Sequence, residues 1–152
     1  MIKEKPYIVL FILAFLILVY SFISKSEETL MINIGGTYIN TKNIFFCQLY
    51  SIFMIMLGLI YLTFDRGKVR LLHLFSYAHI LGTGFLFFLV LYFNYYNQLV
   101  YCGPMDIESL ITKPDYNQYI VLSFFMIILL QILFIINIFV AIIKRPKNSN
   151  RY

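Results

Sequence analysis

The sequence contains few charges, few chain-breaking residues and no tryptophan. Asp, Glu, Lys and Arg make up only 12% of its 152 residues, whereas about a quarter is usual for a water-soluble domain. Its four prolines and seven glycines are too few for a collagen-like or low-complexity chain. Most of the sequence is apolar: 61% of the residues are hydrophobic, and the mean hydropathy is +0.82. The composition therefore predicts a membrane protein, with residues 1–152 forming one membrane domain.

Four segments lack Asp, Glu, Lys and Arg and are long enough to cross a bilayer. They are residues 7–23, 44–64, 71–93 and 119–143. At about 1.5 Å per residue, helices of these lengths match a hydrocarbon core of roughly 30 Å. Their apolar residues are continuous rather than alternating, which favours helices over strands. The sequence thus predicts an all-α, polytopic four-helix bundle with outer loops at 24–43 and 94–118.

The positive charges predict which way these helices point. Nine of the 12 Lys and Arg residues lie near the two chain ends or between the second and third predicted helices. The two longer loops contain only Lys25, Lys42 and Lys113. Because cytoplasmic segments carry an excess of positive charge, we expect both termini on the cytoplasmic side of the inner (cytoplasmic) membrane. Anionic lipid headgroups account for the net charge of +5, so no nucleic-acid partner is predicted.

The outer loops contain turn signals and one of the two cysteines. Gly35 and Gly36 predict a turn leading into the second helix. The loop at 94–118 is large enough to cap the bundle. If it folds over the bundle, Cys102 can approach Cys47 near the outer end of the second helix. The sequence leaves open whether these two cysteines form a disulfide.

Neutral polar residues follow one face of the third predicted helix. Ser76, His79 and Thr83 are spaced i, i+3 and i+7, which places them on the same face. Ala78 and Gly82 form a small-xxx-small pair that favours close approach of another helix. We therefore expect a packing seam along this helix. A haem, quinone or proton site lined by His79 is the alternative interpretation.

The fourth predicted helix carries two further polar residues, Gln131 near its middle and Asn137 nearer its end. Amide side chains inside a bilayer usually make hydrogen bonds between helices. The expected polar seam therefore comprises six residues: Ser76, His79, Gly82, Thr83, Gln131 and Asn137.

Motifs for catalysis or for metal binding are missing from the sequence. There is no nucleophile elbow, HExxH, phosphate loop or cluster of Cys, His and carboxylates. His73 and His79 are six residues apart on one helix, about 120° around its axis, so they cannot hold one haem from opposite sides. We therefore predict no catalytic residue, no metal site and no cofactor, and hence a protein that is not an enzyme.

A faint family pattern begins in the first outer loop. Gly36-Thr37-Tyr38 is followed by Asn43-Ile44-Phe45, then by a short basic turn, a helix with glycines, a loop with Pro and acids, and a last helix. In this order, residues 34–143 resemble the last three helices of haem-copper oxidase subunit I. Asn43 and Phe45 stand where that family has two haem-ligating histidines, and Gly36 stands where it has Asp. The resemblance therefore implies a shortened relative without haem or oxidase activity, retained as a scaffold or accessory subunit.

The sequence as a whole favours a non-catalytic structural or interaction subunit of a membrane complex. Its expected partners are the lipid bilayer and either further copies of itself or another membrane subunit. Two alternatives remain open. One is a redox accessory, related to haem-copper oxidase subunit I, in which His79 shares a haem or quinone site with a partner. The other is an oligomeric pore or membrane-perturbing component of a toxin or defence system, with the polar stripe of the third helix lining its axis.

Overall fold

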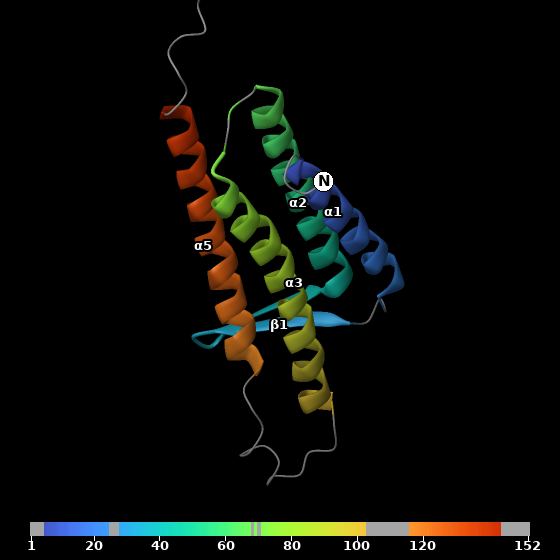
Figure 1. The fold of residues 1–152 in the computed structure, drawn as a ribbon. Coiled ribbons are helices and arrows are strands. Elements are labelled where there is room, and N and C mark those ends of the chain that lie inside the picture. Colours follow the sequence, from blue (N-terminus) through green and yellow to red (C-terminus); the bar gives the residue numbers. More distant parts are fainter. Residues whose placement is uncertain (1–4, 25–27, 68, 70, 103–115, 144–152) are drawn as a thin grey trace, which may run out of the picture.

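The computed structural model describes residues 5–24, 28–67, 69, 71–102 and 116–143, and the side chains of all of these except residues 100–102. They form four helices and a β-hairpin (Figure 1). In chain order the elements are α1 (Pro6–Ile23), β1 (Thr29–Ile34), β2 (Thr37–Lys42), α2 (Asn43–Arg66), α3 (His73–Cys102) and α5 (Tyr116–Ile143). All four helices are long and apolar enough to cross a membrane, so that part of the prediction is confirmed.

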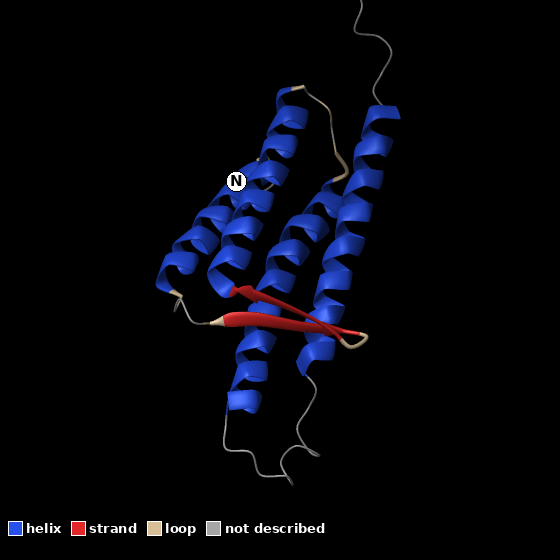
Figure 2. Cartoon of the chain, turned by 180° about the vertical axis from the view of Figure 1, so that it is seen from behind, coloured by secondary structure: helices blue, strands red, loops and turns tan. Residues whose placement is uncertain are grey.

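The helices pack as two pairs, α1 with α2 and α3 with α5. The start of α1, the connection from α2 to α3 and the end of α5 lie at one end of the bundle, which we call the terminal end (Figure 1). The hairpin lies near the opposite end, which we call the hairpin end. Its strands run across α3 and α5 (Figure 2).

Three helices match their predicted ranges within three residues, but α3 is longer than predicted. It continues to Cys102 rather than ending at residue 93. Residues 94–98 are polar or aromatic and contain no glycine or proline, so they continue the helix after the apolar segment ends. The predicted loop at 94–118 is therefore wrong for residues 94–102 and 116–118. The remainder of that loop, with its expected capping role, lies outside the described residues.

The loop at 24–43 contains a hairpin, so the all-α prediction is wrong in this segment. Ile34 pairs with Thr37 across the turn, and Gly35 and Gly36 have φ angles of 57° and 89°. Positive φ at both central residues is the geometry of a two-residue type I′ turn, whose twist suits the flanking strands. The predicted turn is thus at the right residues, but it joins two strands.

The hairpin is held against the helices by apolar contacts and by side-chain amides. Leu30 and Ile32 of β1 are buried with Val90 of α3 and Ile120 of α5. At the outer edge of β1, Asn117 Oδ1 accepts a hydrogen bond from the Asn33 N–H at 2.7 Å, and its Nδ2 donates to the Asn33 carbonyl at 2.8 Å. One amide of α5 therefore pairs with the strand edge as a neighbouring strand would.

Replacing Asn117 with alanine is expected to loosen the hairpin. The change removes both hydrogen bonds to Asn33, and we expect a loss of about 1–2 kcal/mol in the free energy of unfolding. Hydrogen exchange should quicken at the Asn33 amide and leave the middle of α2 unchanged. The neighbouring Gln118 is exposed and serves as the control, since Gln118→Ala should alter neither value. An unchanged exchange rate at Asn33 in Asn117→Ala would contradict this role.

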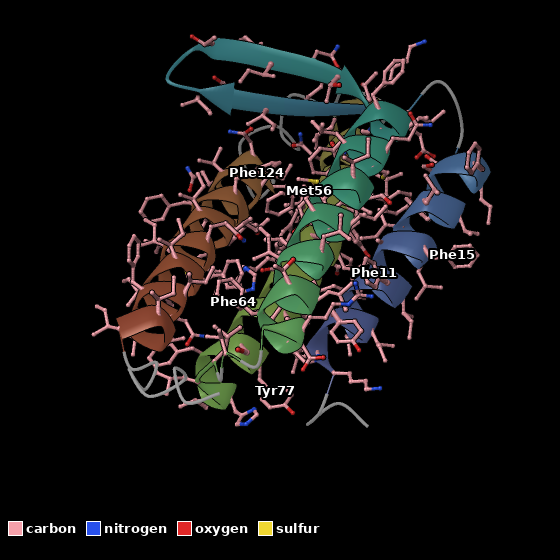
Figure 3. All side chains as sticks on the ribbon, turned by 90° about the horizontal axis from the view of Figure 1, so that it is seen from above. Phe11, Phe15, Met56, Phe64, Tyr77 and Phe124 are labelled. Atoms are coloured by element: carbon pink, nitrogen blue, oxygen red, sulfur yellow. The ribbon has the colours of Figure 1, made fainter. Side chains whose placement is uncertain are left out.

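Aromatic rings join the two helix pairs. Phe46 and Tyr50 of α2 stack on Phe87 of α3, with ring centroids 5.6 and 4.2 Å apart. Phe46 also meets Phe124 of α5 edge to face, with centroids 5.7 Å apart. Side chains thus fill the space between α2 and α5 (Figure 3).

Candidate functional site

The polar stripe predicted on the third helix lies inside the bundle. Ser76, His79 and Thr83 are 5%, 0% and 0% exposed. Ser76 contacts Asn137 of α5, and His79 contacts Tyr61 of α2 and Gln131 of α5. The Thr83 carbonyl accepts a hydrogen bond from Tyr50 of α2. Their shared face of α3 therefore points toward α2 and α5. The stripe is therefore enclosed within a single chain.

His79 has a hydrogen-bond partner at each ring nitrogen. The Tyr61 hydroxyl of α2 is 3.2 Å from Nδ1, and Gln131 Oε1 of α5 is 2.9 Å from Nε2. Gln131 also donates from Nε2 to the Ile127 carbonyl at 3.4 Å, which assigns its oxygen to His79. Nε2 of His79 therefore carries the hydrogen, and Nδ1 accepts from Tyr61. These partners are compatible with a neutral imidazole, and the ring connects α2, α3 and α5.

An aromatic ring covers this imidazole. Phe134 of α5 stacks on His79 with centroids 4.4 Å apart and an interplanar angle of 8°. It also stacks on Tyr61 at 4.9 Å. A charged imidazolium in this apolar setting would be costly unless an anion paired with it.

Asn137 of α5 holds the beginning of α3. Its Oδ1 accepts a hydrogen bond from the Leu72 N–H at 3.0 Å, and its Nδ2 donates to the Leu72 carbonyl at 3.4 Å and to Ser76 Oγ at 3.2 Å. The bond from the Leu72 N–H satisfies a backbone donor at the start of a helix, where donors have no partner within the helix. Ser76 lies one turn before His79 on α3. We call the pair Ser76 and Asn137, together with Tyr61, His79 and Gln131, the His79 network.

The remaining predicted seam residues lie beside this network. Thr83 donates from Oγ1 to the His79 carbonyl at 2.5 Å, and its own carbonyl accepts from the Tyr50 hydroxyl at 2.9 Å. Gly82 faces α5 so closely that a Cβ atom there would lie 2.7 Å from Leu130 Cδ1. Ala78, however, is exposed, so it does not form a common packing surface with Gly82.

A second polar cluster lies at the hairpin end. Asn94 of α3 donates to Asn43 Oδ1 and to the Thr29 carbonyl, both at 3.2 Å. Asn43 donates from Nδ2 to Glu28 Oε2 at 3.3 Å, and Ser24 Oγ donates to the same oxygen at the same distance. These contacts fix the hairpin to the start of α2 and to the C-terminal part of α3. The sequence analysis missed this cluster because its members come from three separated segments.

The two positions of the oxidase resemblance differ in their surroundings. Asn43 is 4% exposed and belongs to the polar cluster at the hairpin end. Phe45 is 61% exposed on the outside of α2. The two side chains therefore point to different environments.

The cysteine and metal predictions concern residues that the structure describes only in part. Cys47 is a buried free thiol, whereas the side chain of Cys102 lies outside the described residues, as does any pairing of it. Among the residues that the structure describes, no three His, Cys, Asp or Glu side chains gather in a group able to hold a metal ion.

Tyr61 and Phe134 complete the surroundings of His79, and the sequence analysis did not single them out. Tyr61 nevertheless carried a usable signal, because Tyr50, Met54, Leu57 and Tyr61 recur every three or four residues and lie on the buried face of α2. A tyrosine on such a face needs a hydrogen-bond partner inside the bundle.

No protein-family model, curated protein or solved structure matches this chain. Its function is therefore inferred from the geometry of the bundle and of the His79 network.

Proposed function

We propose that this chain is a four-span protein of the inner (cytoplasmic) membrane that acts without catalysis, as a structural or interaction subunit of a membrane complex. The observation that carries this proposal is the apolar outer surface of all four helices. Each helix exposes large apolar side chains, for example Phe15 (65%), Leu49 (68%), Phe85 (63%) and Phe139 (61%). Phe15 points away from the bundle (Figure 3). Soluble monomers rarely expose contiguous apolar patches of more than a few hundred Å².

The interior supports the absence of catalysis. In lipid, polar groups must find partners within the protein, and the side chains of the His79 network bond to one another or to the backbone. Both nitrogens of His79 are engaged, so no free general base stands beside it among the residues that the structure describes. The network thus serves to join helices.

The distribution of charge supports a cytoplasmic terminal end. The start of α1, the end of α2, the start of α3 and the end of α5 all lie at this end, and most of the Lys and Arg residues are next to these helix ends in the sequence. Because positively charged segments tend to be retained in the cytoplasm, this distribution supports the proposal that both termini lie on that side.

Burial of the polar stripe on α3 counts against both the pore and the redox alternatives. A pore lined by Ser76, His79 and Thr83 needs these residues on an outer face of the chain, whereas they are at most 5% exposed. A haem shared with a partner through His79 would have to displace Tyr61 or Gln131 from the imidazole. Both arrangements require the bundle to open, and the structural role does not.

Topology is tested with single cysteines in a chain whose native cysteines are replaced by alanine. Asn40 in β2 and Asp65 near the end of α2 are both exposed, and they lie at opposite ends of the bundle. A membrane-impermeant maleimide should label Asn40→Cys in intact cells and Asp65→Cys only after permeabilisation. Recovery of the chain in the soluble fraction, or the reverse labelling pattern, would refute the proposed insertion.

The subunit role is tested by stoichiometry. After extraction in a mild detergent, native mass spectrometry should find the chain in a fixed ratio with another membrane protein or with itself. A single copy in every mild detergent tried would contradict the interaction role. A haem absorption band in the purified protein would instead support the redox alternative.

A further inference from the structure

The edge of the hairpin formed by β1 is closed by amide side chains of the helices. Asn117 of α5 pairs with the backbone of Asn33. Asn94 and Gln98 of α3 both donate to the Thr29 carbonyl. β1 therefore has hydrogen-bond partners on both sides, with β2 on one and the bundle on the other. A strand edge covered in this way is protected from pairing with another chain.

The opposite edge, formed by β2, lacks this cover. Asn33, whose backbone points outward to Asn117, lies opposite Tyr38, so the N–H and C=O of Tyr38 also point outward. The same orientation recurs at every second residue, and hence at Asn40 and Lys42. Among the residues that the structure describes, none hydrogen-bonds to these outward groups. The three side chains are exposed, Tyr38 by 76%.

The hairpin projects from one side of the bundle. In Figures 1 and 2 its strands lie at one level of the helices, whereas in Figure 3, turned by 90°, they lie apart, with β2 on the side of β1 away from α5. The sheet therefore runs across the helices rather than along them. No described helix lies beyond β2 in Figure 3, which leaves room there for another strand.

We propose that β2 pairs antiparallel with β2 of a second copy of this chain and joins the two hairpins into one four-stranded sheet. This inference rests on the membrane insertion and the interaction role proposed above. A two-fold axis that relates two neighbouring antiparallel strands is perpendicular to their sheet. Since the sheet runs across the helices, this axis runs along them, and both copies cross the bilayer in the same direction. The geometry of the edge thus suits a second copy, which must share the topology of the first.

The sequence of β2 favours one register for this pairing. With Asn40 opposite Asn40 of the second copy, each Tyr38 lies opposite a Lys42. Each hydrogen-bonded pair exchanges two bonds, so the three pairs form about six and use every outward group of these residues. The register also separates the two Lys42 ammonium groups and places each beside a tyrosine ring, which attracts a cation.

Disulfide cross-linking in membranes tests this register in the full-length chain, with its native cysteines replaced by alanine. Oxidation with copper phenanthroline should link Asn40→Cys to the same residue of the second copy. Thr37→Cys is the matched control, because it is exposed on the same strand. In this register residue 37 lies opposite residue 43, so the two copies of residue 37 are six residues, or roughly 20 Å, apart. A disulfide does not span that distance.

A mixed pair of cysteines gives a sharper test of the register. Two copies of the chain with different tags carry Tyr38→Cys and Lys42→Cys, respectively. Expressed together, they should cross-link to each other. Each variant expressed alone should not, because its two cysteines are four residues, or roughly 13 Å, apart.

Proline at residue 40 tests the backbone hydrogen bonds. Asn40→Pro removes an outward N–H at the centre of the pairing and no bond within the hairpin. Native mass spectrometry in mild detergent should find dimers of the wild type and of Asn40→Ala, which keeps this N–H, and at least tenfold fewer dimers of Asn40→Pro. Slow hydrogen exchange at the Asn33 amide, which Asn117 binds, shows that the hairpin remains folded.

Three results would overturn the proposal: no link between Tyr38→Cys and Lys42→Cys, equal cross-linking at residues 37 and 40, or a dimer of Asn40→Pro as abundant as that of the wild type. The cross-links do not depend on the proline variant. A link from Asn40→Cys to a different membrane protein would also overturn it, while the interaction role would stand. Failure of membrane insertion is distinguished by the labelling of Asp65→Cys, at the other end of the bundle.

Discussion

Replacing His79 with alanine is expected to lower the free energy of unfolding by about 3 kcal/mol, since the change leaves a cavity and two unpaired polar groups. The imidazole is fully buried, and its loss deprives both the Tyr61 hydroxyl and Gln131 Oε1 of a partner. The space beside Phe134, which stacks on the ring, would also be left empty. The measurement is a reversible unfolding titration with SDS in mixed micelles, followed by circular dichroism.

His73 supplies the control for this prediction because it is the same residue type on the same helix, but exposed. His73→Ala should stay within about 0.5 kcal/mol of the wild type, as surface substitutions usually do. A double-mutant cycle of His79→Ala with Gln131→Ala should give a coupling of about 0.6 kcal/mol, the average for hydrogen bonds between helices in membranes. If His79→Ala and His73→Ala unfold at the same SDS fraction, the network does not hold the bundle together.

The four helices were predictable because lipid imposes a simple requirement. A segment that crosses it must satisfy its own backbone hydrogen bonds and carry few charges, and both conditions are visible in uninterrupted apolar sequence. The stripe of Ser76, His79 and Thr83 was predictable for a similar reason, since helical spacing alone places the three on one face.

The end of α3 was not predictable by the same criterion. Absence of charge and high hydropathy indicate which part of a helix can lie in lipid. Backbone hydrogen bonding, however, continues α3 beyond that part, through Asn94 and Asn97, to Cys102. Leu30, Ile32 and Ile34 did carry the alternating pattern of a strand. That pattern covers only six residues, and its apolar face becomes meaningful once Val90 and Ile120 are known to lie beside it.

The partners of His79 were predictable only in part. Gln131 and Asn137 stood out because amides are rare in an apolar span. Which α3 residue each amide meets depends on the offset between α3 and α5, and that offset is set by packing over the whole pair. Tyr61 was harder to assign, because a tyrosine in a span suits an interface anchor as well as a buried hydrogen-bond donor. The residue type alone does not distinguish these two roles.

Gly82→Leu is expected to destabilise the bundle by about 3 kcal/mol, at the upper end of the cost of inserting atoms into a packed interior. A Cβ atom at Gly82 would lie 2.7 Å from Leu130 Cδ1, and real Cβ atoms do not come so close to a neighbour. The larger side chain would therefore separate α3 from α5 and lengthen the His79–Gln131 hydrogen bond, which lies one turn away. The same SDS titration measures the loss of stability.

Two further variants decide whether close helix packing is the cause. Ala78→Leu adds a side chain one turn earlier on α3, at an exposed position, and should leave stability within about 0.5 kcal/mol of the wild type. Leu130→Ala removes the methyl groups that the new side chain would strike, so adding it to Gly82→Leu should recover part of the loss. Residues in contact are expected to show such non-additive effects, of about 0.5–3 kcal/mol. Two results would mean that α3 and α5 do not meet at Gly82: equal losses of stability for Ala78→Leu and Gly82→Leu, or losses that simply add when Leu130→Ala is combined with Gly82→Leu. In either case, helix packing at Gly82 would not be what positions Gln131 against His79.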